Sequence, residues 1–129
     1  MEKEIYGIFD GQCFVAADGT KYPVAGNYAS KSQLLEGDAL KLIIDADGDF
    51  FYKQVGPVPR KRIIAKVIVE DGCVMIHNNT KLDWRILPSS ATFFKLKEGD
   101  EVIAIIPRDK PAFWAAIEMV TTKKPSFSY

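Results

Sequence analysis

The sequence has few cysteines, which exported proteins use in disulfides, and few histidines, which many enzymes use in catalysis. It holds two cysteines and one histidine among 129 residues. No apolar run approaches the roughly 20 residues that a membrane-spanning helix needs. Residues 1–4 are acidic and have no apolar segment behind them, so we expect no signal peptide and no membrane partner. The few cysteines indicate a reducing, cytoplasmic location without a structural disulfide.

The chain also lacks an excess of charge, because 17 basic residues balance 17 acidic ones. This balance excludes a uniformly basic nucleic-acid clamp. The charges are unevenly placed, however: residues 1–56 hold 5 Lys and 9 acidic residues, whereas residues 57–129 hold 12 basic and 8 acidic ones. Hydrophobic residues make up 47% and aromatic residues 12%, which predicts a packed core rather than disorder.

Catalytic motifs are scarce. There is no glycine-rich phosphate loop, and one histidine does not make a nucleophilic triad. His77 and Cys73 would need further ligands to hold zinc, and only the distant Cys13 is available. We therefore expect no catalytic residue, no metal and no cofactor, and predict that the protein is not an enzyme.

The alternating carboxylates of residues 45–49 are similar to the start of a calcium-binding loop. An EF-hand would place glycine and glutamate where this chain has Phe50 and Gly56. A hairpin turn at Asp47-Gly48 explains the same residues without a metal.

An internal repeat is the most informative feature of the sequence. Cys13 and Thr20-Lys21 recur as Cys73 and Thr80-Lys81, and the offset in residue number is the same for both features. Further on, two pairs of features recur at a spacing two residues longer: Glu36-Gly37-Asp38 with Glu98-Gly99-Asp100, and Phe51-Tyr52 with Phe113-Trp114. We interpret the chain as two copies of one module and expect Cys13 and Cys73 to be equivalent, buried positions.

The hydrophobic alternation predicts the strands of each copy. In the first we expect strands over 5–9, 13–17, 21–24, 39–44 and 50–55, with a helical turn within 27–34. In the second we expect strands over 63–70, 73–77, 81–85, 100–106 and 112–120, with a helical turn over 88–93.

This order predicts an all-β fold of two tandem small β-barrels with short helical turns. Each barrel is expected to be OB-like, with an SH3-like barrel as the alternative. The modules would span 1–57 and 63–122, separated by a linker at 58–62 and followed by a tail at 123–129. Modules this small are marginal alone, so we expect them to pack together.

The aromatic residues bear on how the modules pack. In a strand, Phe51 must point away from its neighbours Phe50 and Tyr52. We expect this second apolar face, like that of Phe113-Trp114, to pack on the other module, with a partner surface as the alternative. Trp84 is expected to lie in the core.

The first module resembles cold-shock and related RNA-binding OB domains. The resemblance is carried by Gly7-Ile8-Phe9, Gln12-Cys13-Phe14-Val15, Asp18-Gly19 and Leu35-Glu36-Gly37-Asp38. It implies single-stranded nucleic acid lying over aromatic rings of the second and third strands, here Phe14, Tyr22 and Tyr28. The Lys-Gly-x-Gly-Phe and Val-Phe-Val-His-Phe signatures of the cold-shock family are missing. The whole chain also resembles short proteins of small-genome bacteria, a likeness that implies no mechanism.

Basic residues cluster where the charge changes sign, at Arg60, Lys61, Arg62 and Lys66. Cations neutralise a nucleic-acid backbone while bases stack on aromatic rings. We therefore expect these four to contact phosphates, in a binding protein for RNA or single-stranded DNA that associates with ribosomes or transcripts.

The expected stacking residues lie in the acidic half, so such binding would have to span both modules. The alternative is a protein-interaction adaptor or a homodimer that uses exposed aromatics or unpaired strand edges. Acidic and basic halves could also pair head to tail between chains.

Overall fold

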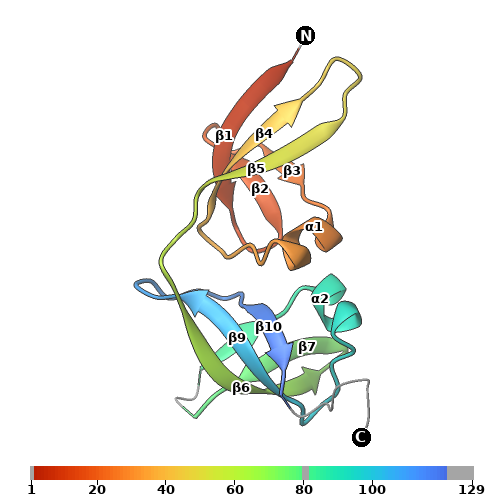
Figure 1. Cartoon of the computed structure of the whole chain (residues 1–129), viewed down its shortest axis with the longest axis vertical. Coiled ribbons are helices and arrows are strands. Elements are labelled where there is room, and N and C mark those ends of the chain that lie inside the picture. The colour runs from red at the N-terminus through yellow and green to blue at the C-terminus, as the bar shows by residue number, and fades with distance from the viewer. Residues whose placement is uncertain (1, 80–81, 122–129) are drawn as a thin grey trace, which may run out of the picture.

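A computed structural model describes residues 2–79 and 82–121 of the chain. The elements are, in chain order, β1 Lys3–Phe9, β2 Cys13–Ala16, β3 Lys21–Pro23, α1 Gly26–Lys31, β4 Ala39–Ile44, β5 Phe50–Gly56, β6 Arg60–Glu70, β7 Cys73–His77, β8 Asp83–Arg85, α2 Pro88–Phe93, β9 Glu101–Pro107 and β10 Ala116–Val120. Figure 1 shows two stacked units joined at one side by the segment between β5 and β6. Neither described helix is long and apolar enough to cross a membrane. The predicted tail at 123–129 and Lys81 lie outside the described residues.

The strands form two five-stranded antiparallel sheets, with the orders β3-β2-β1-β4-β5 and β10-β9-β6-β7-β8. The first strand of each unit pairs with both the second and the fourth. Within the described residues no continuous ladder closes either sheet, although a single parallel bridge joins Arg85 to Trp114. The prediction of an all-β chain is therefore confirmed, whereas closed barrels are not.

Alternation along the strands separates the cores from the surface. In β4, Leu40 and Leu42 are fully buried while Lys41 between them reaches Glu4 on the outer face at 3.0 Å. The first core consists of Phe9, Phe14, Ala16, Ala29, Leu34, Leu40 and Leu42. The second consists of Ala65, Val67, Ile76, Trp84, Ile86, Val102, Ala104, Ile106, Ala115 and Ile117. Trp84 is thus a core residue, as expected.

Both Glu-Gly-Asp turns have the same hydrogen bonds. Asp38 accepts the N–H of Leu35 on its carboxylate at 2.8 Å, as Asp100 accepts that of Lys97 at 2.9 Å. The Asp38 carbonyl accepts the N–H of Phe9, and the Asp100 carbonyl that of Val67. The repeat in the sequence therefore corresponds to a repeat of local structure.

The equivalence of the two cysteines is wrong. Phe9 pairs with Phe14 across the first hairpin, whereas the corresponding Val67 pairs with Ile76. The second hairpin is therefore longer, and Cys73 lies at its exposed tip while Cys13 is half-buried. Both thiols are free. The two cysteines match in spacing only because the second hairpin is longer than the first. A comparison of sequences does not distinguish such a match from a structurally equivalent position.

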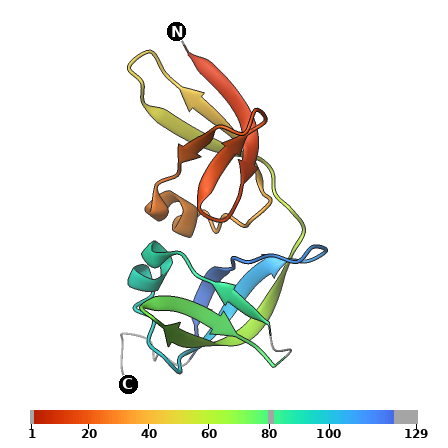
Figure 2. The same ribbon diagram turned by 180° about the vertical axis from the view of Figure 1, so that it is seen from behind.

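The units pack together at α1 and α2, at the Trp114 ring, and in a small buried cluster of Leu35, Ile105 and Ala116. The Ser30 hydroxyl lies 2.9 Å from that of Ser89 and 2.7 Å from that of Ser90, so α1 and α2 are joined directly. Figures 1 and 2 show these helices facing each other from both sides. Gly11 has a φ of 110° and lies against the Trp114 ring, where a Cβ would overlap ring atoms. The expected packing of the modules is confirmed.

The connection between the units is shorter than the predicted linker at 58–62, because β5 ends at Gly56 and β6 already begins at Arg60. A buried ion pair braces it: the Arg60 guanidinium donates to both carboxylate oxygens of Asp38, at 2.7 and 2.8 Å. Asp38 also accepts the N–H of Val58 at 2.9 Å, and Arg60 donates to the Gln33 carbonyl at 3.0 Å. Asp38 is 0% exposed, so all of its partners come from the protein.

We expect Asp38→Ala to lower the free energy of unfolding by about 3–5 kcal/mol, because it leaves the Arg60 charge without its buried partner. Urea denaturation followed by circular dichroism measures this. The control is Arg62→Ala, which removes the exposed ion pair with Glu118 and should cost at most about 1 kcal/mol. Equal losses for the two variants would contradict the structural role of Asp38.

Tyr52 links the two edge strands of the first sheet. It lies on β5, and its hydroxyl donates to the Pro23 carbonyl on β3 at 2.6 Å. Burial raises the pKa of Tyr52 to about 12, with smaller contributions from Cys13 and Tyr22. The folded protein therefore holds this proton more tightly than the unfolded chain does.

The raised pKa of Tyr52 stabilises the folded state fully below pH 10, the pKa of the unfolded chain. This contribution to the free energy of unfolding is lost as the pH rises to about 12, the pKa in the folded protein. We expect the urea midpoint to fall over this range, and to fall less in Tyr52→Phe. Tyr6→Phe, at an exposed tyrosine, should retain the full decrease. An identical pH profile in wild type and Tyr52→Phe would contradict the assignment.

Candidate nucleic-acid interface

The consecutive cations at the start of β6 have three different surroundings. Arg60 faces the junction and uses its Nε, Nη1 and Nη2 groups in hydrogen bonds within the protein. Lys61 lines a surface cavity. Arg62 is on the outer face, where its Nε lies 2.6 Å from Glu118. Lys66, further along the strand, is exposed.

The loop between β9 and β10 adds two cations that sequence analysis missed, next to Phe113, which it expected to pack on the other module or to meet a partner. Arg108 and Lys110 are exposed on this loop, and Phe113 is 74% exposed. The hydrogen bond that Arg108 donates to the Asp109 carboxylate, together with the charge of that carboxylate, raises the pKa of Arg108 above its usual value. The expected strand over 112–120 starts only at Ala116, because residues before it form this loop. The segment Pro107-Arg108-Asp109-Lys110-Pro111, with two prolines and two cations, was the available signal.

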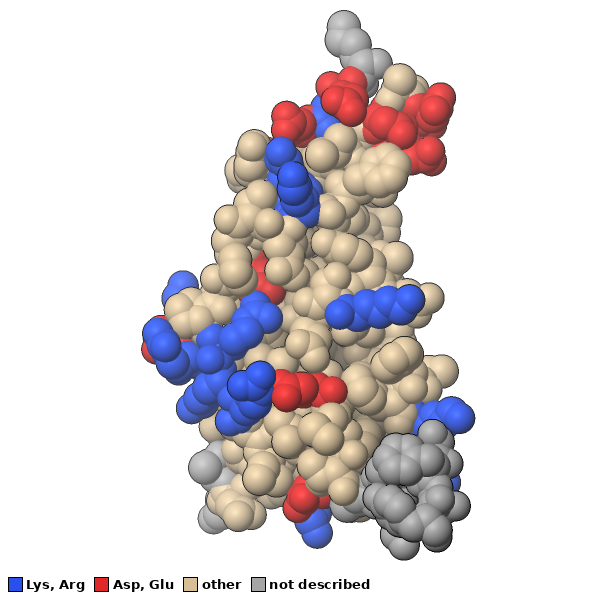
Figure 3. Space-filling view, in the orientation of Figure 1, with Lys and Arg blue, Asp and Glu red and all other residues tan. Residues whose placement is uncertain are grey.

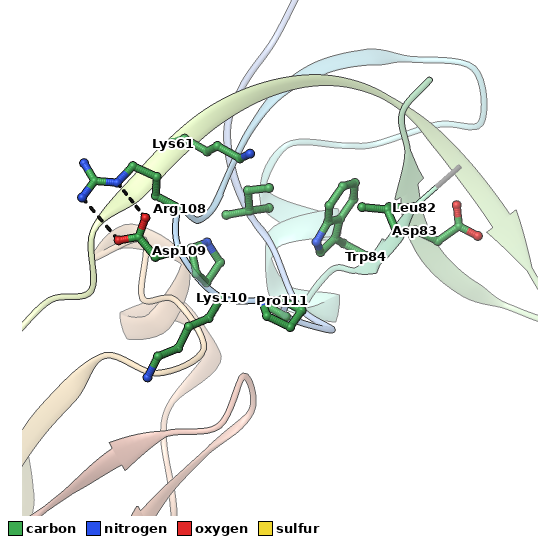
Figure 4. Close-up of a pocket in the computed structure, with 11 residues that line it drawn as sticks. Lys61, Leu82, Asp83, Trp84, Arg108, Asp109, Lys110 and Pro111 are labelled. Carbon is green, nitrogen blue, oxygen red and sulfur yellow. Dashed lines mark hydrogen bonds and ion pairs between the residues drawn. The ribbon is translucent and has the colours of Figure 1, made fainter. Parts of the chain in front are cut away.

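A cavity of about 330 Å³ opens between this loop and the sheet. Its lining includes the apolar side chains of Leu82, Trp84, Ile106, Pro107, Pro111 and Ala112. In Figure 4, Lys61 reaches over the cavity toward Trp84, whereas Arg108 and Lys110 extend away from it along the loop. The cavity therefore combines an apolar wall with cations at its edge.

The acidic residues at this cavity are already paired. Asp83 lies 2.6 Å from the His77 ring, and Asp109 pairs with Arg108 at 3.2 Å. Among the residues that the structure describes, neither Lys61 nor Lys110 has an ion-pair partner. Figure 3 shows Lys and Arg side chains gathered over the start of β6 and the adjacent loop, while acidic side chains gather at the far tip of the first unit.

The predicted stacking residues lie elsewhere. Phe14 is 0% exposed in the first core, so its ring offers no face to a base. Its ring contacts those of Tyr22 and Tyr52, with centroids 6.0 and 5.5 Å apart. Tyr28 stacks on Tyr52 and donates its hydroxyl to the Tyr52 carbonyl at 3.2 Å. These rings hold the first unit together, and the structure does not bring them to the cations of the second.

The outer face of the first sheet exposes further apolar side chains. Phe51 points outward and is 54% exposed, so it does not pack on the second unit as expected. Tyr6, Ile8 and Val55 are exposed on the same sheet. The Phe113 side chain also remains exposed, although its backbone N–H donates to the Glu36 carboxylate of the first unit at 3.1 Å, and the Trp114 ring lies against Gly11.

The carboxylates of Asp45, Asp47 and Asp49 lie within 4.8 Å of one another. One Asp45 oxygen accepts the backbone N–H groups of both Asp47 and Asp49 at 2.9 Å. These hydrogen bonds shape the β4–β5 turn, and they account for the three aspartates as turn-forming residues.

No protein-family model matches the chain, and no curated protein matches it.

Proposed function

We propose that this protein is a non-enzymatic binding protein for RNA or single-stranded DNA, and that it binds through its second unit. The contact surface, called the basic surface below, consists of Lys61, Arg108 and Lys110 around the cavity. Arg62 and Lys66 lie on the other face of β6 and are left out of it. The observation that carries the proposal is that Lys61 and Lys110, which have no ion-pair partner among the residues the structure describes, lie at an apolar cavity. Phosphates would pair with the cations, and an unpaired base would meet apolar side chains.

Single strands fit this surface better than duplexes do. An apolar cavity can accept a base only when the base is unstacked and unpaired, as in single strands and loops. Phe113 offers a further exposed ring on the same loop. Phe14 is left out of the proposed surface because it is fully buried, and Arg60 because it is paired with Asp38. Tyr22 and Tyr28 are left out because they are half-buried among the aromatic rings of the first unit and do not line the cavity.

We also propose that each unit is an OB-like barrel. The first strand pairs with the second and fourth strands, and a short helix precedes the fourth. In the second unit the Arg85–Trp114 bridge brings the end of β8 to the chain just before β10. In the first unit the Tyr52 hydrogen bond to Pro23 joins β5 to β3. An SH3-like barrel remains the alternative. Association with ribosomes or transcripts in the cytoplasm is part of this proposal.

The second candidate is a protein-interaction adaptor or a homodimer. It is favoured by the exposed apolar side chains of the first sheet, Tyr6, Ile8, Phe51 and Val55. Ile64 on β6 is also 65% exposed. A partner covering these side chains would bury apolar area without using the basic surface.

Fluorescence anisotropy with labelled single-stranded RNA, single-stranded DNA and duplex DNA, at low and near-physiological salt, tests the proposal. We expect saturable binding to single strands that weakens with salt. In Lys61→Ala/Lys110→Ala, the slope of log affinity against log salt should fall by about 0.7 for each phosphate contact removed. Arg60 is left intact because its loss would disturb the Asp38 ion pair.

The matched control is Lys31→Ala/Lys53→Ala, which removes the same charge from the first unit and should leave binding near wild type. Absence of binding at low salt would overturn the proposal. A mass that rises with protein concentration in sedimentation, without nucleic-acid binding, would instead favour the homodimer.

A further inference from the structure

The cavity beside Trp84 has the size of a site for one small group. Ligand cavities in proteins usually have volumes of about 300–1,000 Å³, and this one, at about 330 Å³, is at the lower end. It is therefore suited to part of a strand rather than to a run of stacked bases. Its wall is mostly apolar, while its charged groups lie at the edge.

The cations divide into one that faces the cavity and two that face outward. Lys61 lies over the cavity toward Trp84, whereas Lys110 and Arg108 extend from the loop into solvent (Figure 4). A phosphate attached to a group inside the cavity would lie near Lys61. Phosphates that follow or precede it would lie outside, near Lys110. An isolated anion would need the cations but not the apolar wall.

From this arrangement we infer that the cavity takes a single nucleotide of the bound strand, with its base against Leu82, Pro111 and Ala112 and its phosphate at Lys61. Lys110 then contacts the phosphate of a neighbouring nucleotide outside the cavity. This inference rests on the proposed function, because the cavity lies within the basic surface. The inference adds that one base of the bound strand is unstacked from its neighbours and held in the cavity.

The test follows the Trp84 indole N–H resonance by NMR during titration with uridine 5′-monophosphate, uridine, inorganic phosphate and an eight-residue oligouridylate. We expect the monophosphate to shift this resonance saturably, and uridine or phosphate alone to bind at least about tenfold more weakly. Losing one charge-assisted contact in Lys61→Met should weaken both the monophosphate and the oligonucleotide by about tenfold. Lys110→Met should weaken only the oligonucleotide, and the control Lys31→Met neither ligand.

The outcomes separate this inference from the proposed function. Oligonucleotide binding without any monophosphate effect on Trp84 overturns the nucleotide site and leaves the proposed function intact. Equal binding of monophosphate and inorganic phosphate indicates an anion site and also overturns it. Monophosphate binding without oligonucleotide binding overturns the proposed function, and with it the inferred strand. Binding of neither ligand overturns both.

Discussion

The Asp38 carboxylate holds the two units in one arrangement, and the position of the basic surface depends on it. A fully buried carboxylate is stable only when its oxygens are paired. Here one oxygen shapes the Glu-Gly-Asp turn through Leu35, and both receive the Arg60 guanidinium from the start of β6. The turn of the first unit is thereby fastened to the first strand of the second. Because β6 also carries Lys61, Arg62 and Lys66, the same ion pair sets where these cations lie relative to the first unit.

Strand alternation explains why neighbouring cations have different roles. Side chains at every second position share a face, so Arg60 and Arg62 lie on one side of β6 and Lys61 on the other. Near the junction that first side meets Asp38, and further along it is open to solvent and Glu118. A cluster of cations in a sequence therefore does not amount to a cluster on a surface. Sequence analysis grouped these residues because the tertiary partner, Asp38, is far away along the chain.

Most of the strand order could be predicted because one-sided burial leaves a period of two in the sequence, as in Leu40 and Leu42 around Lys41. The repeated Glu-Gly-Asp turns were likewise recognisable, since their hydrogen bonds are local. The cysteine equivalence failed because hairpin length depends on pairing across the turn rather than on residue identity. Arg108 and Lys110 were missed because loop residues carry no periodicity, and their site is formed only when the loop meets Lys61 and Trp84.

The aromatic residues also show that residue type alone does not predict which side chains are exposed. Phe14, Tyr22 and Tyr28 have the composition expected of a stacking surface, yet their rings contact one another and Tyr52 inside the first unit. A unit this small has few side chains large enough to fill its core, so its aromatic residues are used for packing first. Of the three predicted rings, Phe14 is fully buried and Tyr22 and Tyr28 are half-buried, and the first unit has no excess of positive charge. The second unit, whose core is largely aliphatic, leaves Phe113 exposed next to its cations. In the proposed function the two units therefore differ in role: the acidic unit supports the arrangement, and the basic unit is the one proposed to contact phosphate.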